Sequence, residues 1–446
     1  MPYRMRDGLD ESIVREISER KNEPKWMLEF RLKCLKIYHE MAMPNFGPDL
    51  SGLDMAHISS YVRASDAMVS SWNEVPADIR KIFDELGIPE AEKESLAGVG
   101  AQYDSELVYH NLKTAAAQQG VVYCGIEEAL HKRKYSRMIR EHFMKLVTPR
   151  DHKFAALHGA VWSGGSFVYV PAGAAVEFPL QSYFRFNAPG AGQFEHTLII
   201  VEPGAKLHFI EGCSAPKYNV ANLHAGCVEI YVREGAEMKY STVESWSKNM
   251  YNLNTKRAYV ERGGKMEWVT GSFGSRVSML YPMAILAGDG ARMEYTGVSF
   301  AGDGQDLDTG VKVVHEAPNT SSYINSKSIA KDGGINTFRN YVKVCAGADN
   351  AKSFTDCQTL MLDSVSMSDT IPYFDVQNAS ADIAHEANVG KISAAAISYL
   401  QTRGLSEDDA RALIVRGFAN DISKELPLEY AMEMNNYIKL EMSENM

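Results

Sequence analysis

The segments EPGAKLHF (202–209) and REGAEMKY (233–240) decide the fold, because each carries a glycine-led turn that runs directly into an apolar strand. Related copies read PAGAAVEF, ERGGKMEW and GDGARMEY. The marker glycines are Gly173, Gly204, Gly235, Gly264 and Gly290, at steps of 31, 31, 29 and 26 residues. A repeat of this length is typical of stacked, quasi-one-dimensional folds, in which residues one step apart lie above one another.

The region from 155 to 390 is expected to form the β core. In MKYSTVESW (238–246), residues alternate with period two, so Met238, Tyr240, Glu244 and Trp246 share one face. Short strands at this spacing fit either a solenoid or a sandwich, and the regular glycines favour a parallel β-helix. After Gly290 the repeat looks less regular.

Helical regions are expected on both sides of this core. Residues 1–154 read as mainly helical, including the stretch 104–140. In residues 391–446, Gly404 is placed to end one helix and Ser406 to cap the next. A helical tail of this kind can cap the end of a stack or dock a partner, and the pattern does not choose between them.

Composition and motifs exclude several classes of function. The net charge of −11 argues against nucleic acid or anionic membrane as the main partner, and no apolar run is long enough for a transmembrane helix. The six cysteines form no CxxC pair, which fits reduced thiols in the cytoplasm better than a disulfide framework. Because GxxxxGK[ST] is lacking, any ATP that is needed must be hydrolysed by another protein.

Cys213 and Glu244 each lie nine residues after a marker glycine, so the repeat predicts that they stack on adjacent coils, roughly 5 Å apart. A buried carboxylate needs a partner, and Lys256 is a candidate. The alternatives are that Cys213 is merely a small buried apolar residue, and that Glu244 and Lys256 lie on the surface.

Cys357 precedes His385 and Glu386 by 28 and 29 residues, which is again one coil. A thiolate beside an imidazole suits iron, iron–sulfur clusters or zinc, and proximity to the imidazole would lower the thiol pKa. Two such ligands plus a carboxylate make an incomplete site unless a second chain contributes. The alternative is a polar patch at the end of the solenoid.

Together these residues resemble the SufB family, the scaffold subunit of the SUF iron–sulfur cluster assembly system. The likeness runs nearly end to end and includes VWSGGSFVYVP, GQFEHTLIIVEPGA, EGCSAPKY, YNLNTKRA and SDTIPYFDVQNASADIAHEANVGKIS. It implies a right-handed parallel β-helix core with a C-terminal helical domain that docks a SufC-like ABC ATPase. It also implies pairing of the core with a SufD-like paralogue or with a second copy, and sulfur delivery by a cysteine desulfurase.

The resemblance also assigns roles to single residues. Cys213, in EGC, matches the sulfur acceptor, and Glu244, Trp246 and Lys256 match an internal sulfur path. Cys357, in SFTDC, matches the interface cysteine at which a transient cluster forms, with His385 and Glu386 as further iron ligands. The implied protein is a cytoplasmic scaffold and not an enzyme; whether a reduced flavin joins the complex stays open.

Two residues depart from the family pattern, since Ala384 replaces a usual glutamate and Glu244 replaces a frequent glutamine. Two rival interpretations remain. A carbohydrate-active β-helix enzyme should show clustered exposed Asp and Arg on one solenoid face and a secretory signal, and the sequence shows no such signal. A purely structural, SufD-like partner of the ATPase would not need the thiols of Cys213 and Cys357.

Overall fold

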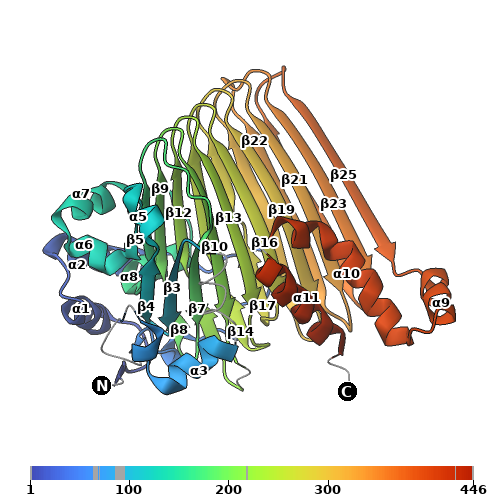
Figure 1. The fold of residues 1–446 in the computed structure, drawn as a ribbon, viewed down its shortest axis with the longest axis horizontal. Coiled ribbons are helices and arrows are strands. Elements are labelled where there is room, and N and C mark those ends of the chain that lie inside the picture. The colour runs from blue at the N-terminus through green and yellow to red at the C-terminus, as the bar shows by residue number, and fades with distance from the viewer. Residues whose placement is uncertain are drawn as a thin grey trace.

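A parallel β-solenoid, flanked by helices at both ends of the chain, makes up the computed structural model (Figure 1). The structure describes residues 3–63, 69, 71–85, 96–216, 219–426 and 428–443. One sheet has ten strands in the order β25-β23-β21-β19-β16-β13-β10-β7-β3-β4. The other face is a sheet through which β20, β22 and β24 complete the last coils. The parallel solenoid core expected from the glycine repeat is therefore confirmed.

The strands of the ten-stranded sheet are β3 (Gly98–Tyr103), β4 (Glu106–Leu112), β7 (Leu180–Arg185), β10 (Lys206–Ser214), β13 (Glu237–Ser245), β16 (Lys265–Phe273), β19 (Arg292–Ala301), β21 (Ser321–Ala330), β23 (Lys352–Met361) and β25 (Asp382–Lys391). The facing strands are β5 (Val122–Gly125), β6 (Ser166–Val170), β8 (Gly192–Gln193), β9 (His196–Val201), β11 (Asn222–His224), β12 (Cys227–Val232), β14 (Met250–Asn252), β15 (Thr255–Val260), β17 (Val277–Leu280), β18 (Met283–Leu286), β20 (Asp306–His315), β22 (Ile335–Val344) and β24 (Met367–Val376). A separate pair joins β1 (Tyr3–Arg4) to β2 (Val62–Arg63).

The strand register confirms that residues one repeat apart pair with each other, with one correction to the marker glycines. Lys206, Glu237, Lys265 and Arg292 pair in one line across the sheet. Two residues before each lies a glycine with positive φ, and in the third copy it is Gly263 (φ 62°), not Gly264. The left-handed conformation that the turn needs thus falls on the first glycine of the pair.

The repeat does not become irregular after Gly290, contrary to the sequence-based expectation. The same line of pairs continues through Ser321, Lys352 and Asp382. What changes is the other half of the coil. In earlier coils it is broken into two short strands, such as β17 and β18, and both of these pair with the single long strand β20. At the turns before β21 and β23, the residue with positive φ is Asn319 (φ 56°) or Asn350 (φ 58°) in place of glycine, so the glycine motif is lost while the spacing persists.

The ten-stranded sheet begins earlier in the chain than expected. The stretch 104–140 contains β4 and β5 as well as the helices α5 (Thr114–Gln118), α6 (Ile126–His131) and α7 (Arg133–His142). Strands β4 and β5 pair antiparallel with β3 and β6, respectively, and complete the first coil. The other N-terminal helices are α1 (Glu11–Arg20), α2 (Lys25–Glu40), α3 (Ala77–Glu85) and α8 (Lys153–Val161), with 3-10 turns at Met55–His57 and Trp72–Glu74.

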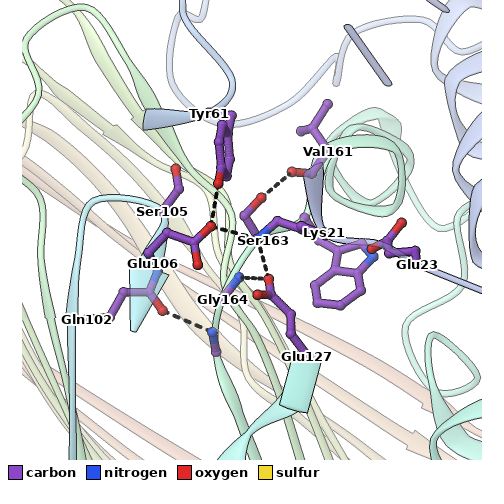
Figure 2. Close-up of polar contacts among 12 residues, drawn as sticks. Lys21, Glu23, Tyr61, Gln102, Ser105, Glu106, Glu127, Val161, Ser163 and Gly164 are labelled. Carbon is purple, nitrogen blue, oxygen red and sulfur yellow. Dashed lines mark hydrogen bonds and ion pairs between the residues drawn. The ribbon is translucent and has the colours of Figure 1, made fainter. Parts of the chain in front are cut away.

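A buried polar network ties the N-terminal helices to this first coil (Figure 2). Lys21, which follows α1, places its ammonium 2.6 Å from the Glu127 carboxylate and 3.0 Å from that of Glu106. Tyr61 donates to Glu106, and the backbone N–H of Gly164 donates to Glu127. Each charged side chain of this network therefore has a partner of opposite charge. The network joins the N-terminal helices to the first coil without leaving an unpaired ion.

The C-terminal helices are α9 (Ala394–Thr402), α10 (Glu407–Glu425) and α11 (Leu428–Ser443). Two of them, α10 and α11, lie along the outer face of the ten-stranded sheet, whereas α9 lies beyond β25 (Figure 1). Val415, Ile422, Met434 and Ile438 pack on outward-facing sheet residues such as Val269. The expected caps are confirmed: Gly404 has a φ of 92°, and the Ser406 hydroxyl accepts from the N–H of Asp409. No helix within the described residues is long and apolar enough to span a membrane.

Candidate functional site

Cys213 and Glu244 stack directly on neighbouring strands, as the repeat predicts. They are paired residues of β10 and β13, and their exposed fractions are 1% and 2%. Both point inward because Leu207, Phe209 and Glu211 alternate on the same buried face of β10. The surface alternative for Glu244 is therefore wrong.

Lys256 reaches the same cluster from β15 on the facing sheet. Its ammonium lies 2.6 Å from a Glu211 oxygen, 3.7 Å from a Glu244 oxygen and 2.8 Å from the Thr242 hydroxyl. Oxygen and sulfur ligand atoms of Glu211, Cys213 and Glu244 all lie within 4.8 Å of one another. Because the ammonium already compensates these carboxylates, the arrangement works as an ion network around a thiol.

A second chain of contacts extends from Glu244. The side-chain amide of Asn252 donates to Glu244 at 2.6 Å, and its oxygen lies 2.9 Å from His224, which in turn lies 2.6 Å from Glu195. The Trp246 ring stands over His224 with centroids 4.6 Å apart, and packs in the apolar cluster that also holds Cys213. The thiol therefore sits on a boundary between an aromatic pocket and a charged interior.

The electrostatics favour a protonated thiol and a charged lysine at neutral pH. Burial, reinforced by Glu211 and Glu244, raises the pKa of Cys213 well above its ordinary value. Burial alone would lower the pKa of Lys256, but the attraction of the same two carboxylates outweighs it and raises that pKa. Deprotonation of Cys213 therefore needs a base at the moment of reaction, and the two carboxylates are the adjacent candidates.

A line of small residues connects this cluster to Cys357. We call it the Cys357 column, defined by the paired residues Glu211, Thr242, Thr270, Gly297, Ser326 and Cys357. Four of them, Thr242, Thr270, Gly297 and Ser326, also line an interior cavity together with Glu244 and Lys256. Its volume is about 20 Å³, which is enough for a water molecule. The cavity ends before Cys357, which packs in the main apolar core cluster of the solenoid.

Cys357 is buried, with an exposed fraction of 4%, in the next-to-last coil. Burial, with a smaller effect of Asp356, raises its pKa to about 12. The expectation that a neighbouring imidazole lowers this pKa is wrong for the single chain. The register explains why, since Cys357 pairs with Ala387 and His385 pairs with Thr355 two residues away.

His385 and Glu386 are on the strand next to Cys357, as the spacing predicts, but on opposite faces of it. His385 pairs with Thr355, whose buried side chain faces the same interior as Cys357. The Nε2 atom of His385 is buried without a hydrogen-bond partner. Glu386 pairs with Asp356 and is exposed. Within one chain, the three residues therefore do not converge on a single point.

Among the strands that the structure describes, β24 pairs only with β22 and β25 only with β23, so the last coil is open. Long unpaired edge strands readily pair with another chain. Large apolar side chains are exposed on this coil, which we call the open end: Met367, Ile371, Tyr373, Phe374, Val376 and Val389. The open end therefore has both the backbone groups and the apolar surface of an interface.

Sequence reasoning missed several residues of the inner cluster. Glu211 was visible two residues before Cys213 on the same face, and the alternation alone could have included it. Tyr240 donates to Glu211, and His224, Glu195 and Asn252 extend the network. These three come from the facing sheet or its corners, where no repeated glycine marks the register.

Two family models together match most of the chain. The model described as "SUF system FeS cluster assembly, SufBD core domain" matches residues 184–418, and "SufBD protein N-terminal region" matches residues 65–182. Similar relatives are iron–sulfur cluster assembly SufBD family proteins of Staphylococcus epidermidis and Staphylococcus aureus strain MRSA252. Each is 49% identical over 440 residues, covering 99% of this chain and 94% of the relative.

Proposed function

Because the chain belongs to the SufBD family of iron–sulfur cluster assembly proteins, we propose that it is the SufB-type scaffold of that system, which receives sulfur and builds the cluster. The observation that carries this proposal is the Cys357 column, whose small and polar residues lead from the buried Cys213 cluster to Cys357, one strand from the open end. A partner with a purely structural role would have no need of two thiols joined by a polar interior.

Sulfur would enter at Cys213. A persulfide of a cysteine desulfurase or carrier transfers its outer sulfur to Cys213, which becomes Cys213–S–SH, while the donor leaves as a thiolate. The Cys213 proton passes to Glu244 or Glu211 and finally to the departing thiolate, so no net oxidation occurs. Lys256 stabilises negative charge on the thiolate and on the persulfide during this exchange.

Movement from Cys213 to Cys357 spans five strand spacings, from β10 to β23, or roughly 24 Å. Two thiols cannot exchange sulfur directly over this distance, so the column would carry a small sulfur species. Release as hydrogen sulfide consumes two electrons and two protons and regenerates the Cys213 thiol. A reduced flavin in the complex is the class of reductant that we propose.

The cluster would form at the open end as cargo of the scaffold. Cys357 and His385 face the same interior and would supply a thiolate and an imidazole to iron. Glu386 lies on the outer face, so its role as a ligand requires the edge strand to adjust when a second subunit pairs with it. That subunit would be a paralogue or a second copy, and its residues would complete the ligand set.

The C-terminal helices would receive a SufC-like ABC ATPase. Support comes from large apolar side chains that remain exposed on the faces turned away from the sheet, namely Tyr399, Leu413 and Met432. A partner that moves these helices would act on the outer face of the strands that hold the column, in the cytoplasm where the SUF proteins act.

The test is replacement of Cys357 by serine. The matched control is Cys345→Ser, in the turn between β22 and β23. We expect Cys357→Ser to abolish cluster formation on anaerobic reconstitution with iron and sulfide, followed by absorption and Mössbauer spectroscopy. The complex with its partners should still form, and Cys345→Ser should keep the cluster. Normal cluster yield in Cys357→Ser would show that the site is elsewhere.

A further inference from the structure

A second group of metal-ligating side chains lies where α8 packs on the first coils, next to the Glu195 end of the network that extends from Glu244. His158 of α8, His196 of β9 and Cys227 of β12 have exposed fractions of no more than 1%. Their ligand atoms all lie within 4.8 Å of one another. The proposed sulfur path uses none of them, and no repeat spacing relates His158 to the other two.

The outer nitrogens of the two imidazoles face oxygens that can only accept hydrogen bonds. His158 Nδ1 lies 2.9 Å from the carbonyl oxygen of Ala225, and His196 Nε2 lies 3.2 Å from a carboxylate oxygen of Glu229. Glu229 is itself fixed by the backbone N–H groups of Met144, Leu146 and Val147. The Ala225 carbonyl accepts from His158 Nδ1, as carbonyls do for metal-bound histidines, whereas His196 Nε2 only lies near the Glu229 carboxylate without hydrogen-bond geometry, and that negative charge favours a proton there.

The inner nitrogens consequently point lone pairs at each other. His158 Nε2 and His196 Nδ1 are 3.0 Å apart, and Cys227 Sγ completes the triangle. At this distance either a proton shared in a hydrogen bond or a metal ion must lie between the two nitrogens. The N···N separation of two ligands in a tetrahedral zinc site is about 3.3 Å, close to the distance seen here.

The dimensions fit an ion after a modest rearrangement. Because the three ligand atoms all lie within 4.8 Å of one another, a point exists within about 2.8 Å of each. Zinc bonds are about 2.0–2.1 Å to nitrogen and about 2.3 Å to sulfur, so closure by about half an ångström or somewhat more is needed. Phe143 stacks on the His196 ring at 4.1 Å, which keeps that imidazole in place.

We propose that His158, His196 and Cys227 bind one divalent transition metal ion of the zinc type, which joins α8 to the first coils of the solenoid. Binding converts the Cys227 thiol to a thiolate and releases its proton to solvent. The three side chains leave the fourth position of a tetrahedral ion to a water molecule. Because they are buried and belong to three separate elements, the ion enters as the protein folds. This site is independent of the proposed sulfur path.

The test uses the full-length chain, metal analysis and cobalt as a spectroscopic probe. We expect the protein to retain one molar equivalent of Zn²⁺ after gel filtration. Exchange for Co²⁺ should give tetrahedral d–d bands and a thiolate-to-cobalt charge-transfer band. Cys227→Ser should lose this charge-transfer band, whereas Cys124→Ser, a buried thiol outside the group, should keep it. Glu229→Gln should weaken metal affinity about 10–100-fold.

Two further variants distinguish this proposal from the proposed function. Cys213→Ser and Cys357→Ser should fail in cluster assembly, but both should retain the metal. If Cys227→Ser does not fold, X-ray absorption of the zinc-loaded wild-type protein decides, and it should report one sulfur and two imidazole nitrogens. A chain without bound metal, or a Cys227→Ser variant with an unchanged cobalt spectrum, would overturn the proposal in favour of a proton shared by the two histidines.

Discussion

Replacement of Lys256 by methionine tests the ion network around Cys213. Methionine keeps most of the side-chain length but removes the only cation within reach of Glu211 and Glu244 among the described contacts. With an effective dielectric constant of about 20, Coulomb attraction is about 6 kcal/mol at 2.6 Å and about 4–5 kcal/mol at 3.7 Å. Desolvation of the three ions and repulsion between the carboxylates cancel much of this gain.

Removal of one partner from a buried ion pair costs about 3–5 kcal/mol, because the remaining charge stays in a poorly solvating interior. We therefore expect Lys256→Met to lower the free energy of unfolding by about 3–5 kcal/mol at neutral pH. The matched control is Lys256→Met combined with Glu211→Gln, which removes one of the two stranded charges. It should recover a large part of the loss, since a neutral amide can still accept from Tyr240.

The assay is urea unfolding of the full-length chain followed by circular dichroism, with all four members of the double-mutant cycle measured at the same pH. A loss below about 1 kcal/mol in Lys256→Met, or a coupling energy below about 0.5 kcal/mol, would refute the view that the lysine compensates buried carboxylates.

Two further predictions address the column and the response to acid. Ser299→Leu adds bulk to an inward-facing residue of the interior cavity, so the yield of cluster should fall sharply although every cysteine is intact. The control Thr296→Leu lies on the outer face of the same strand and should leave the cluster yield normal. Equal yields of the two variants in reconstitution would contradict a passage through the interior. His315 is buried, and burial lowers its pKa to about 4, so the folded chain keeps it neutral while the unfolded chain protonates it below about pH 6.5. Stability from this group is thus lost as the pH falls, and the advantage of wild type over His315→Gln should shrink by about 2 kcal/mol between pH 8 and pH 5 in urea titrations; an advantage that is constant or grows in acid would rule out a buried neutral histidine.

The sequence was sufficient to predict which residues pair between strands that follow equivalent glycine turns. Cys213 falls opposite Glu244 because both strands start at equivalent turns, and the same spacing brings β25 beside β23. The repeat spacing alone was insufficient to predict on which face of a strand a given side chain lies. Glu386 follows His385 directly, so period two sends them to opposite sides, whereas spacing alone groups them with Cys357.

Contacts between unlike elements could not be predicted from the repeat. Lys256 belongs to the facing sheet, and His158 belongs to a helix, so their distances to Glu211 and His196 depend on how whole layers pack. Strand β4 reads ELVYHNL, in which apolar and polar residues mix without clear alternation, and its pairing with β3 reflects the tertiary context more than local propensity.

The two ends of the solenoid also limit how copies can assemble. The first coil is closed by helices and antiparallel strands, whereas the last coil keeps free backbone groups on β24 and β25. If two open ends meet, each chain turns its first coil outward, where the edge strands β4 and β5 are shorter than β24 and β25 and offer less backbone to a third chain. One-sided capping thus converts a fold prone to endless edge-to-edge growth into one whose association by this surface stops at two subunits.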